Sequence, residues 1–365
     1  MNKQILVFSL LVFALINVNF AQDDNSSLPE VKIAGSQLLH IHSAIVDQDY
    51  DLYINLPRYF EDTTKTFPII YLLDAQWDFP LLNGIYGEQY YDGFLPEAII
   101  VGITWGGINP NPDILRRRDF TPSKEGNNPV GGGAEKFLSF IKKELIPFID
   151  STFRTKPGDR TLMGSSLGGL FTLYAMFNET ELFSNYVLTS PAIGWSNGII
   201  NSYEKKFTDP QKPIKLSMAI GGYEDVDYFQ KFVDNLKEKN YPSLKLNSFV
   251  IDGIGHSGGK ADGFTRGLQF VFNKGDLSID PDILKKYTGT YQNPMGFKID
   301  LRLENNHLVA EIPGNGDRIL YASNETEFYM IGQYLKVYFQ NDGDGNTTGF
   351  QVETYDNKFF MKKVD

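Results

Sequence analysis

One serine stands in a spacing that is typical of a catalytic nucleophile. Ser166 is the central residue of Gly164-Ser165-Ser166-Leu167-Gly168, a G-x-S-x-G motif between an apolar strand pattern and an apolar helical pattern. In that context the motif predicts a tight strand–turn–helix elbow, which lifts the serine hydroxyl above the edge of a sheet. The N–H of Leu167 and the helix N-terminus would then be placed to stabilise an oxyanion. The alternative is a glycine-rich packing turn without chemistry, because short motifs of this kind also arise by chance.

A serine nucleophile needs a base, and the chain contains four histidines. His256 lies in a glycine-rich loop after the last strand pattern, and loops at the carboxyl ends of parallel strands are where such sheets bind ligands. His40 and His42 would share one face of an early strand, but no Asp, Glu or Cys in that strand completes a metal site. His307 follows a turn and is expected to be exposed to solvent. His256 is therefore the predicted base, and neither a metal nor a cofactor is predicted.

The third member of such a triad is a carboxylate that orients the imidazole, and it should lie between the serine and the histidine in the chain. A strand pattern at 214–220 runs directly into an acidic cluster at the required edge of the sheet. Within this cluster Glu224 is the first choice, followed by Asp225 and then Asp227. Either aspartate could instead cap the helix that follows.

The elements that must position these residues alternate between strand and helix. Continuous apolar runs at 68–73 and 98–103 are typical of strands buried on both faces, whereas 51–56 alternates as a half-buried antiparallel strand does. Further strands are expected at 160–163, 186–190, 214–220 and 244–251, and helices at 134–149, 167–177, 229–236 and 264–272. The alternation predicts an α/β fold, with a mostly parallel sheet flanked by helices.

A second, smaller domain is predicted after the alternation stops near Lys274. Strand patterns separated by Asn- and Gly-rich turns indicate hairpins, so 278–365 is expected to be a small all-β antiparallel domain and 22–277 the α/β domain. Asp342–Asn346 and Glu353 match the ligand spacing of a calcium-binding EF-hand loop. However, Thr347 replaces the required Gly and strands replace the flanking helices, which favours a hairpin turn.

The N-terminus has the pattern of a secretory signal peptide, because Lys3 precedes an apolar run at 5–18 and Ala21 offers a small residue for cleavage. A membrane anchor is the alternative, but spanning a bilayer takes roughly 20 apolar residues. The sequence therefore predicts a cleaved segment at 1–21, no membrane span, and a periplasmic or secreted protein. Without any Cys, disulfides and thiolate nucleophiles are excluded, and a formal net charge of −11 argues against nucleic acid as a partner.

The chain from about 36 to 274 resembles the putative-esterase family of α/β hydrolases. The resemblance rests on the stretches at 53–57, 71–75, 116–122, 137–149, 164–171 and 183–191. The enterochelin-esterase-like branch is the most similar, through an R-x-R-D-x-T-P segment from Arg116 and an E-L-I-P-F-I segment from Glu144. By this resemblance, the second oxyanion N–H belongs to Gln76, two residues after Asp74, although Ala75 stands where the family usually has Gly.

Four further side chains are candidates for substrate binding. Trp77, Trp105 and Trp195 each follow a predicted parallel strand, so they are expected at the same edge as Ser166, where they would wall a pocket for a flat ring. Arg118 belongs to the run 116–119, in which an arginine either grips an anionic or catecholate substrate or pairs with Asp to pin a long loop.

Together these features predict an exported serine esterase that acts through an acyl-enzyme. Its substrate would be a small-molecule or carbohydrate ester, and a siderophore lactone, a polysaccharide decoration and a lipid ester all fit. Acyl transfer to a sugar or lipid alcohol is an alternative within catalysis. A non-catalytic ligand-binding protein is the alternative outside it, which the intact set of Ser166, Glu224 and His256 argues against.

Overall fold

The computed structural model describes residues 32–107, 109–275 and 277–364, so the predicted signal peptide lies outside the described residues. Contacts along the chain define Gly35–Asp365 as one compact unit, separate from Met1–Ala34. Within the described ranges, no helix has the length and apolar character that crossing a bilayer requires.

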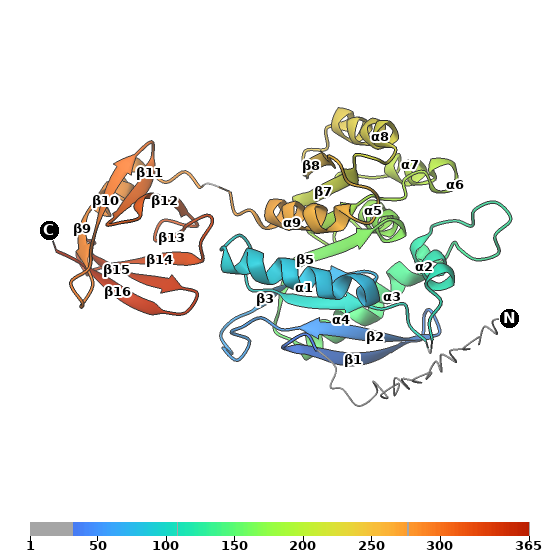
Figure 1. Cartoon of the computed structure of the whole chain (residues 1–365), viewed down its shortest axis with the longest axis horizontal. Coiled ribbons are helices and arrows are strands. Elements are labelled where there is room, and N and C mark those ends of the chain that lie inside the picture. The colour runs from blue at the N-terminus through green and yellow to red at the C-terminus, as the bar shows by residue number, and fades with distance from the viewer. Residues whose placement is uncertain (1–31, 108, 276, 365) are drawn as a thin grey trace, which may run out of the picture. The chain divides into compact units, whose positions relative to one another are not determined.

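A sheet of eight strands forms the first part of this unit, in the order β1-β2-β4-β3-β5-β6-β7-β8 (Figure 1). The two pairings β1–β2 and β2–β4 are antiparallel, and all others are parallel, which confirms the predicted α/β fold. The strands are β1 (Ser36–Ser43), β2 (Gln48–Asn55), β3 (Phe67–Leu72), β4 (Ile99–Ile103), β5 (Thr155–Ser165), β6 (Asn185–Thr189), β7 (Ile214–Gly221) and β8 (Leu244–Ile251).

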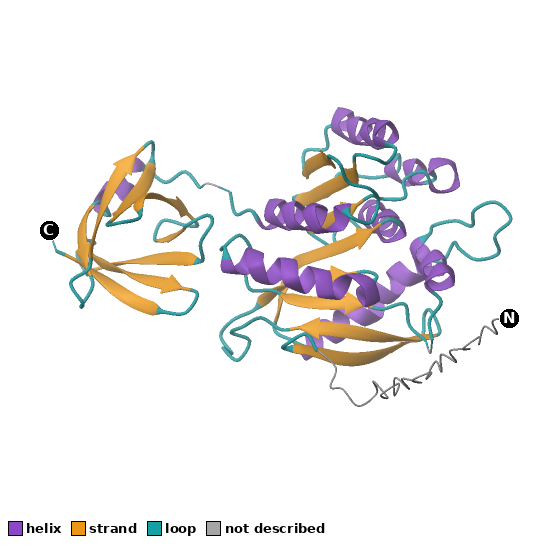
Figure 2. Cartoon of the chain, in the orientation of Figure 1, coloured by secondary structure: helices purple, strands orange, loops and turns teal. Residues whose placement is uncertain are grey.

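Helices connect the strands and cover the sheet (Figure 2). They are α1 (Ala75–Tyr91), α2 (Pro112–Phe120), α3 (Ala134–Phe140), α4 (Ile146–Thr152), α5 (Leu167–Asn178), α6 (Trp195–Gly198), α7 (Ile200–Glu204), α8 (Val226–Lys239) and α9 (Gly259–Phe272). A π-helical segment, Ile141–Leu145, joins α3 to α4, so the predicted helix at 134–149 is built from three pieces.

The central strands are buried on both faces, which explains their continuous apolar runs. Ile69 and Tyr71 of β3 belong to a core cluster that contains Phe137 of α3 and Phe171 of α5. Ile70, between them in the strand, is equally buried but does not belong to that cluster, because neighbouring side chains in a strand point to opposite faces. On that second face α1 and α9 contact each other.

The second part of the unit is a closed eight-stranded antiparallel barrel, which confirms the predicted small all-β domain. The helix α10 (Pro281–Lys286) precedes it. Its strands are β9 (Gly289–Gln292), β10 (Lys298–Glu304), β11 (His307–Ile312), β12 (Gly316–Ala322), β13 (Glu327–Tyr329), β14 (Leu335–Asn341), β15 (Thr347–Thr354) and β16 (Lys358–Lys363). The acidic turn at Asp342 connects β14 to β15, where its carboxylate accepts hydrogen bonds from the N–H groups of Asp344 and Asn346.

The segment at 116–119 belongs to helix α2, which is not among the helices predicted from the sequence. Pro112 stands at the first helical position of α2, and the side chain of Asn111 accepts hydrogen bonds from the N–H groups of Asp113 and Ile114. An Asn cap followed by Pro is a recognised helix start, so the signal was present in the sequence.

Helix α9 contacts β6 through glycines. A Cβ at Gly267 would lie 2.4 Å from Cγ1 of Val187, so this approach requires the absence of a side chain. We expect Gly267→Ala to lower the free energy of unfolding by about 1–3 kcal/mol through overpacking. Gly87→Ala on the exposed face of α1 is the matched control. It meets no atom within 4 Å and should raise stability by about 0.5–1 kcal/mol. Urea denaturation measures both, and equal effects of the two substitutions would contradict the packing account.

Candidate active site

Ser166 occupies the turn between β5 and α5 in a strained backbone conformation, with φ 58° and ψ −116°. The glycines of the motif permit this turn, because a Cβ at Gly164 would lie 2.5 Å from the backbone of Gly168. The last residue of β6 and the segment after it hold the turn on both sides. The N–H of Ser166 donates to the carbonyl of Thr189 at 3.1 Å, and the N–H of Ala192 donates to the carbonyl of Ser166 at 3.0 Å. The elbow predicted from the motif is therefore present at the carboxyl end of β5.

Glu224 and His256 contact each other in the loops after β7 and β8, with 2.5 Å between His256 Nδ1 and Glu224 Oε2. The other carboxylate oxygen of Glu224 accepts hydrogen bonds from Ser190 Oγ at 2.6 Å and from the N–H of Gly221 at 2.9 Å. Burial alone would raise the pKa of Glu224, but the hydrogen bonds from Ser190, His256 and the backbone outweigh it and hold that pKa below its ordinary value. Glu224 is thus an ionised partner that fixes one ring nitrogen of His256.

The other two carboxylates of the acidic cluster serve the helix that follows. Asp225 is the N-cap residue of α8, and its side chain accepts a hydrogen bond from the N–H of Tyr228 at 3.1 Å. Asp227 lies in the first turn of the same helix, where a negative charge is favourable. Of the three candidates, the structure pairs only Glu224 with the histidine.

Gln76 and Leu167 both lie in the first turn of a helix, Gln76 in α1 and Leu167 in α5. N–H groups in a first turn lack an intrahelical acceptor, so they are available to an oxyanion. Asp74, the residue before α1, has a left-handed backbone with φ 56° and ψ 41°, and its carbonyl accepts from the N–H groups of Trp77 and Asp78. This geometry sets where the N–H of Gln76 lies.

The carboxylate of Asp74 is buried, and several elements meet at it. Arg116 of α2 donates to it twice, at 2.6 and 2.9 Å, and Trp105 Nε1 donates at 2.7 Å. Its Oδ2 also occupies the space beside Gly168. A Cβ added at Gly168 would lie only 3.2 Å from this oxygen. The last glycine of the G-x-S-x-G motif therefore makes room for the carboxylate that precedes α1 and the predicted oxyanion donor Gln76.

A second buried ion pair joins the two loops that carry the candidate chemistry. Lys260, four residues after His256, donates to both oxygens of Asp78 at 2.7 and 3.0 Å. Burial raises the pKa of Asp78, although the Lys260 ammonium opposes the rise. The pair ties the start of α9 to the start of α1.

The remaining predicted residues lie in different environments. Trp77 is 48% exposed and contacts Trp105 edge-on, whereas Trp105 and Trp195 are buried. Trp195 Nε1 donates to the carbonyl of Ser123. Arg118 pairs with the buried Asp119 at 2.7 and 2.9 Å, an arrangement that matches the structural alternative kept open for it. Of the three tryptophans, Trp77 is therefore the one whose ring is exposed.

Sequence reasoning missed two supports of the site. Ser190 was read only as the end of a strand, and its contact with Glu224 joins residues 34 positions apart. Arg116 opens the R-x-R-D-x-T-P segment, but nothing in the sequence indicates that it contacts Asp74. In a helix, residues two positions apart lie on different faces, so recognising helix α2 in the sequence separates Arg116 from Arg118.

Comparison with known proteins places this geometry in context. Residues 43–226 match the family model described as "Putative esterase", and residues 274–365 match a domain of unknown function, DUF3471. The chain is 30% identical over 223 residues to the ferri-bacillibactin esterase BesA of Bacillus subtilis, covering 56% of this chain and 76% of that protein. It is 30% identical over 172 residues to a siderophore triacetylfusarinine C esterase of Aspergillus fumigatus, covering 45% and 59%. The crystal structure of an IroE-like serine hydrolase from Shewanella oneidensis matches with a TM-score of 0.57 and 27% identity, covering 67% and 82%.

The support of Asp74 by Arg116 can be tested by kinetics. Arg116→Gln should lower kcat for a small ester about 10- to 100-fold with little change in KM, because a displaced oxyanion N–H weakens only the transition state. Arg116→Lys should recover part of the loss, since it restores the charge without the two-pronged geometry. Arg117→Gln is the control, because the one ion pair that Arg117 makes among the described residues reaches Glu125 at 3.7 Å and does not involve Asp74. A folded Arg116→Gln protein with unchanged kcat would contradict the positioning role.

Proposed function

Because the chain belongs to the putative esterase family of serine hydrolases and is a carboxylic ester hydrolase, we propose that it cleaves the ester bonds of a siderophore through an acyl-enzyme on Ser166. The observation that carries the proposal is the contact of His256 with Glu224, on loops at the same carboxyl edge of the sheet as Ser166, which follows β5 directly. The similarity to BesA over 76% of that esterase supports the choice of substrate class.

In the proposed reaction, His256 accepts the hydroxyl proton of Ser166 as the serine oxygen attacks the ester carbonyl. The N–H groups of Gln76 and Leu167 stabilise the negative charge on the carbonyl oxygen. The intermediate collapses when the imidazolium of His256 gives its proton to the leaving alcohol, and an acyl-enzyme remains. Water then attacks the acyl carbon and gives a proton to His256, and return of that proton to Ser166 releases the acid.

Glu224 has two parts in this cycle. Its contact with Nδ1 fixes the tautomer of His256 in which Nε2 accepts the serine proton, and its charge stabilises the imidazolium that follows. Because the hydrogen bonds from Ser190 and Gly221 keep the pKa of Glu224 low, the carboxylate remains ionised at neutral pH.

Trp77 and Arg116 supply a rim that suits an anionic aromatic group. The guanidinium carbon of Arg116 lies 4.9 Å from the centre of the Trp77 ring. Catecholate-bearing siderophores combine flat rings with negative charge, and such a rim offers them stacking together with a nearby cation. This supports an aromatic siderophore ester over an aliphatic lipid ester.

Export is part of the proposal and has its own test. We propose that residues 1–21 are removed and that the mature protein is periplasmic or secreted. Mass spectrometry of the protein isolated from its native cell should then give an N-terminus at Gln22 in an extracytoplasmic fraction. A full-length chain that remains in the cytoplasm would contradict this part.

The catalytic proposal is tested with a ferric catecholate trilactone as substrate. The wild-type protein should release linear ester fragments, seen by liquid chromatography, and Ser166→Ala and His256→Ala should each slow this release by about 10⁴-fold or more, since the members act as a unit. Asp225→Ala, which removes a helix cap but no triad contact, is the control and should keep most activity. Hydrolysis of p-nitrophenyl acetate without any cleavage of the trilactone would refute the proposed substrate class but not the esterase activity. Normal turnover by Ser166→Ala would refute the mechanism.

A further inference from the structure

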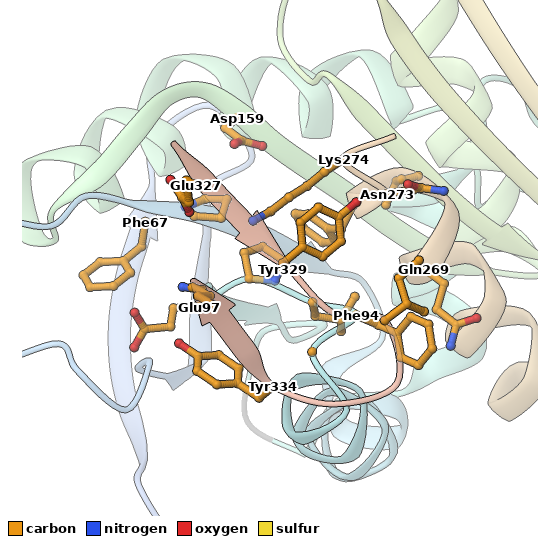
Figure 3. Close-up of a pocket in the computed structure, with 18 of the residues that line it drawn as sticks. Phe67, Phe94, Glu97, Asp159, Gln269, Asn273, Lys274, Glu327, Tyr329 and Tyr334 are labelled. Carbon is orange, nitrogen blue, oxygen red and sulfur yellow. The ribbon is translucent and has the colours of Figure 1, made fainter. Parts of the chain in front are cut away.

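A cavity of about 1440 Å³ lies within the compact unit, at the edge of the sheet away from Ser166 (Figure 3). Its lining includes Phe67 and Asn185, the first residues of β3 and β6, and therefore belongs to the amino ends of the parallel strands. The barrel contributes Tyr329 and Tyr334 to the same lining. The triad loops follow the carboxyl ends of the strands, so the mechanism proposed above does not use this cavity.

The charge of the lining is opposite to that of the whole chain. Eight Lys and Arg side chains line the cavity against four Asp and Glu, whereas the chain carries a formal net charge of −11. Three of the four carboxylates are already paired with lysines, in Lys65–Glu97 at 3.0 Å, Lys156–Asp159 at 2.9 Å and Lys358–Glu353 at 3.0 Å. Among the lining carboxylates this leaves Glu327 to balance the other cations.

Four of these cations, one of them Lys215, lack a carboxylate partner within the described ranges. No carboxylate oxygen there lies within 4.0 Å of the Nζ atom of Lys245, Lys274 or Lys336. Lys274 Nζ instead lies 5.1 Å from the centre of the Tyr329 ring, and Figure 3 shows it extended among the lining side chains. Lys336 Nζ lies 5.1 Å from the centre of the Tyr334 ring.

These ammonium groups are close enough to destabilise one another. Burial lowers the pKa of Lys274, and the positive charges of Lys336 and Lys156 lower it further. The pKa of Lys215 is likewise lowered by burial and by Lys245. Lys215 has a structural task, since it donates to the carbonyls of Val271 and Asn273 at the end of α9. Among the described residues, no hydrogen bond to a carbonyl accounts for Lys274 or Lys336.

We propose that this cavity binds a solute that carries two or more anionic groups joined by flat rings or sugar faces. Ammonium groups that outnumber the carboxylates beside them repel one another and raise the free energy of the empty site, and a bound anion would offset that cost. Tyrosine rings beside both ammonium groups provide surfaces on which a ring can stack. A volume above that of typical small-molecule sites matches a ligand of several rings.

Isothermal titration calorimetry tests the proposal with three probes of different origin. Inositol hexakisphosphate presents dense phosphates, a galacturonate oligosaccharide presents spaced carboxylates, and a gallium tris-catecholate presents a trianionic aromatic complex. We expect at least one probe to bind the full-length protein with an affinity that falls as salt rises. The double variant Lys274→Gln/Lys336→Gln should weaken that binding about tenfold or more.

A matched double variant separates a specific site from general charge. Lys205→Gln/Lys206→Gln removes two exposed lysines just after α7, outside the cavity lining, and should leave the affinity unchanged. Both double variants should keep wild-type hydrolysis of p-nitrophenyl acetate and wild-type thermal unfolding, which shows that the fold is intact. Absence of binding by all three probes, or equal weakening by both double variants, would overturn the proposal without touching the proposed esterase activity.

Discussion

The close approach of helix α5 to strand β5 is the constraint from which the site follows. A Cβ at Gly164 would lie only 2.5 Å from the backbone of Gly168. Any residue other than glycine at position 164 would therefore displace the helix. The chain can turn from strand to helix in so little space only if Ser166 adopts a positive φ, at a cost of about 1–3 kcal/mol. Two hydrogen bonds hold the turn in place: the N–H of Ser166 donates to the carbonyl of Thr189 at the end of β6, and the N–H of Ala192 donates to the carbonyl of Ser166.

The groups around Ser166 depend on supports that lie behind them. Asp74 joins the start of α1 to α2 through Arg116, and its carboxylate lies where a Cβ at Gly168 would be only 3.2 Å away. The pair of Lys260 and Asp78 joins the start of α1 to the helix after His256. An intact buried ion pair adds little net stability, but removing one of its members leaves an uncompensated charge. The main effect of such pairs is therefore to hold the loops in one arrangement.

The fold was predictable because its signals are local. Strands buried on both faces must be continuously apolar, and the turn-rich region after residue 280 has no such run, so the α/β part and the β part separate in the sequence. The motif around Ser166 was predictable for the same reason, since strand, glycines and helix are contiguous.

The supports of the site were not predictable, because they are set by tertiary contacts. Nothing in three adjacent arginines indicates that Arg116 binds Asp74 while Arg118 binds Asp119. Trp105 follows its strand as expected, but it is buried and its indole N–H donates to the carboxylate of Asp74. Of the tryptophans at this edge, Trp77 is the exposed one. Position at the carboxyl edge of a sheet indicates proximity to a site, and only the packing decides which side chains face the substrate.

Covalent labelling is the most direct measurement of the central claim that His256, oriented by Glu224, activates Ser166. A fluorophosphonate reacts with an activated serine and leaves an adduct that peptide mass spectrometry can locate. The account predicts one adduct on Ser166, formed far more slowly in His256→Ala and at an intermediate rate in Glu224→Gln. An adduct on another residue, or equal labelling rates in all three proteins, would contradict it.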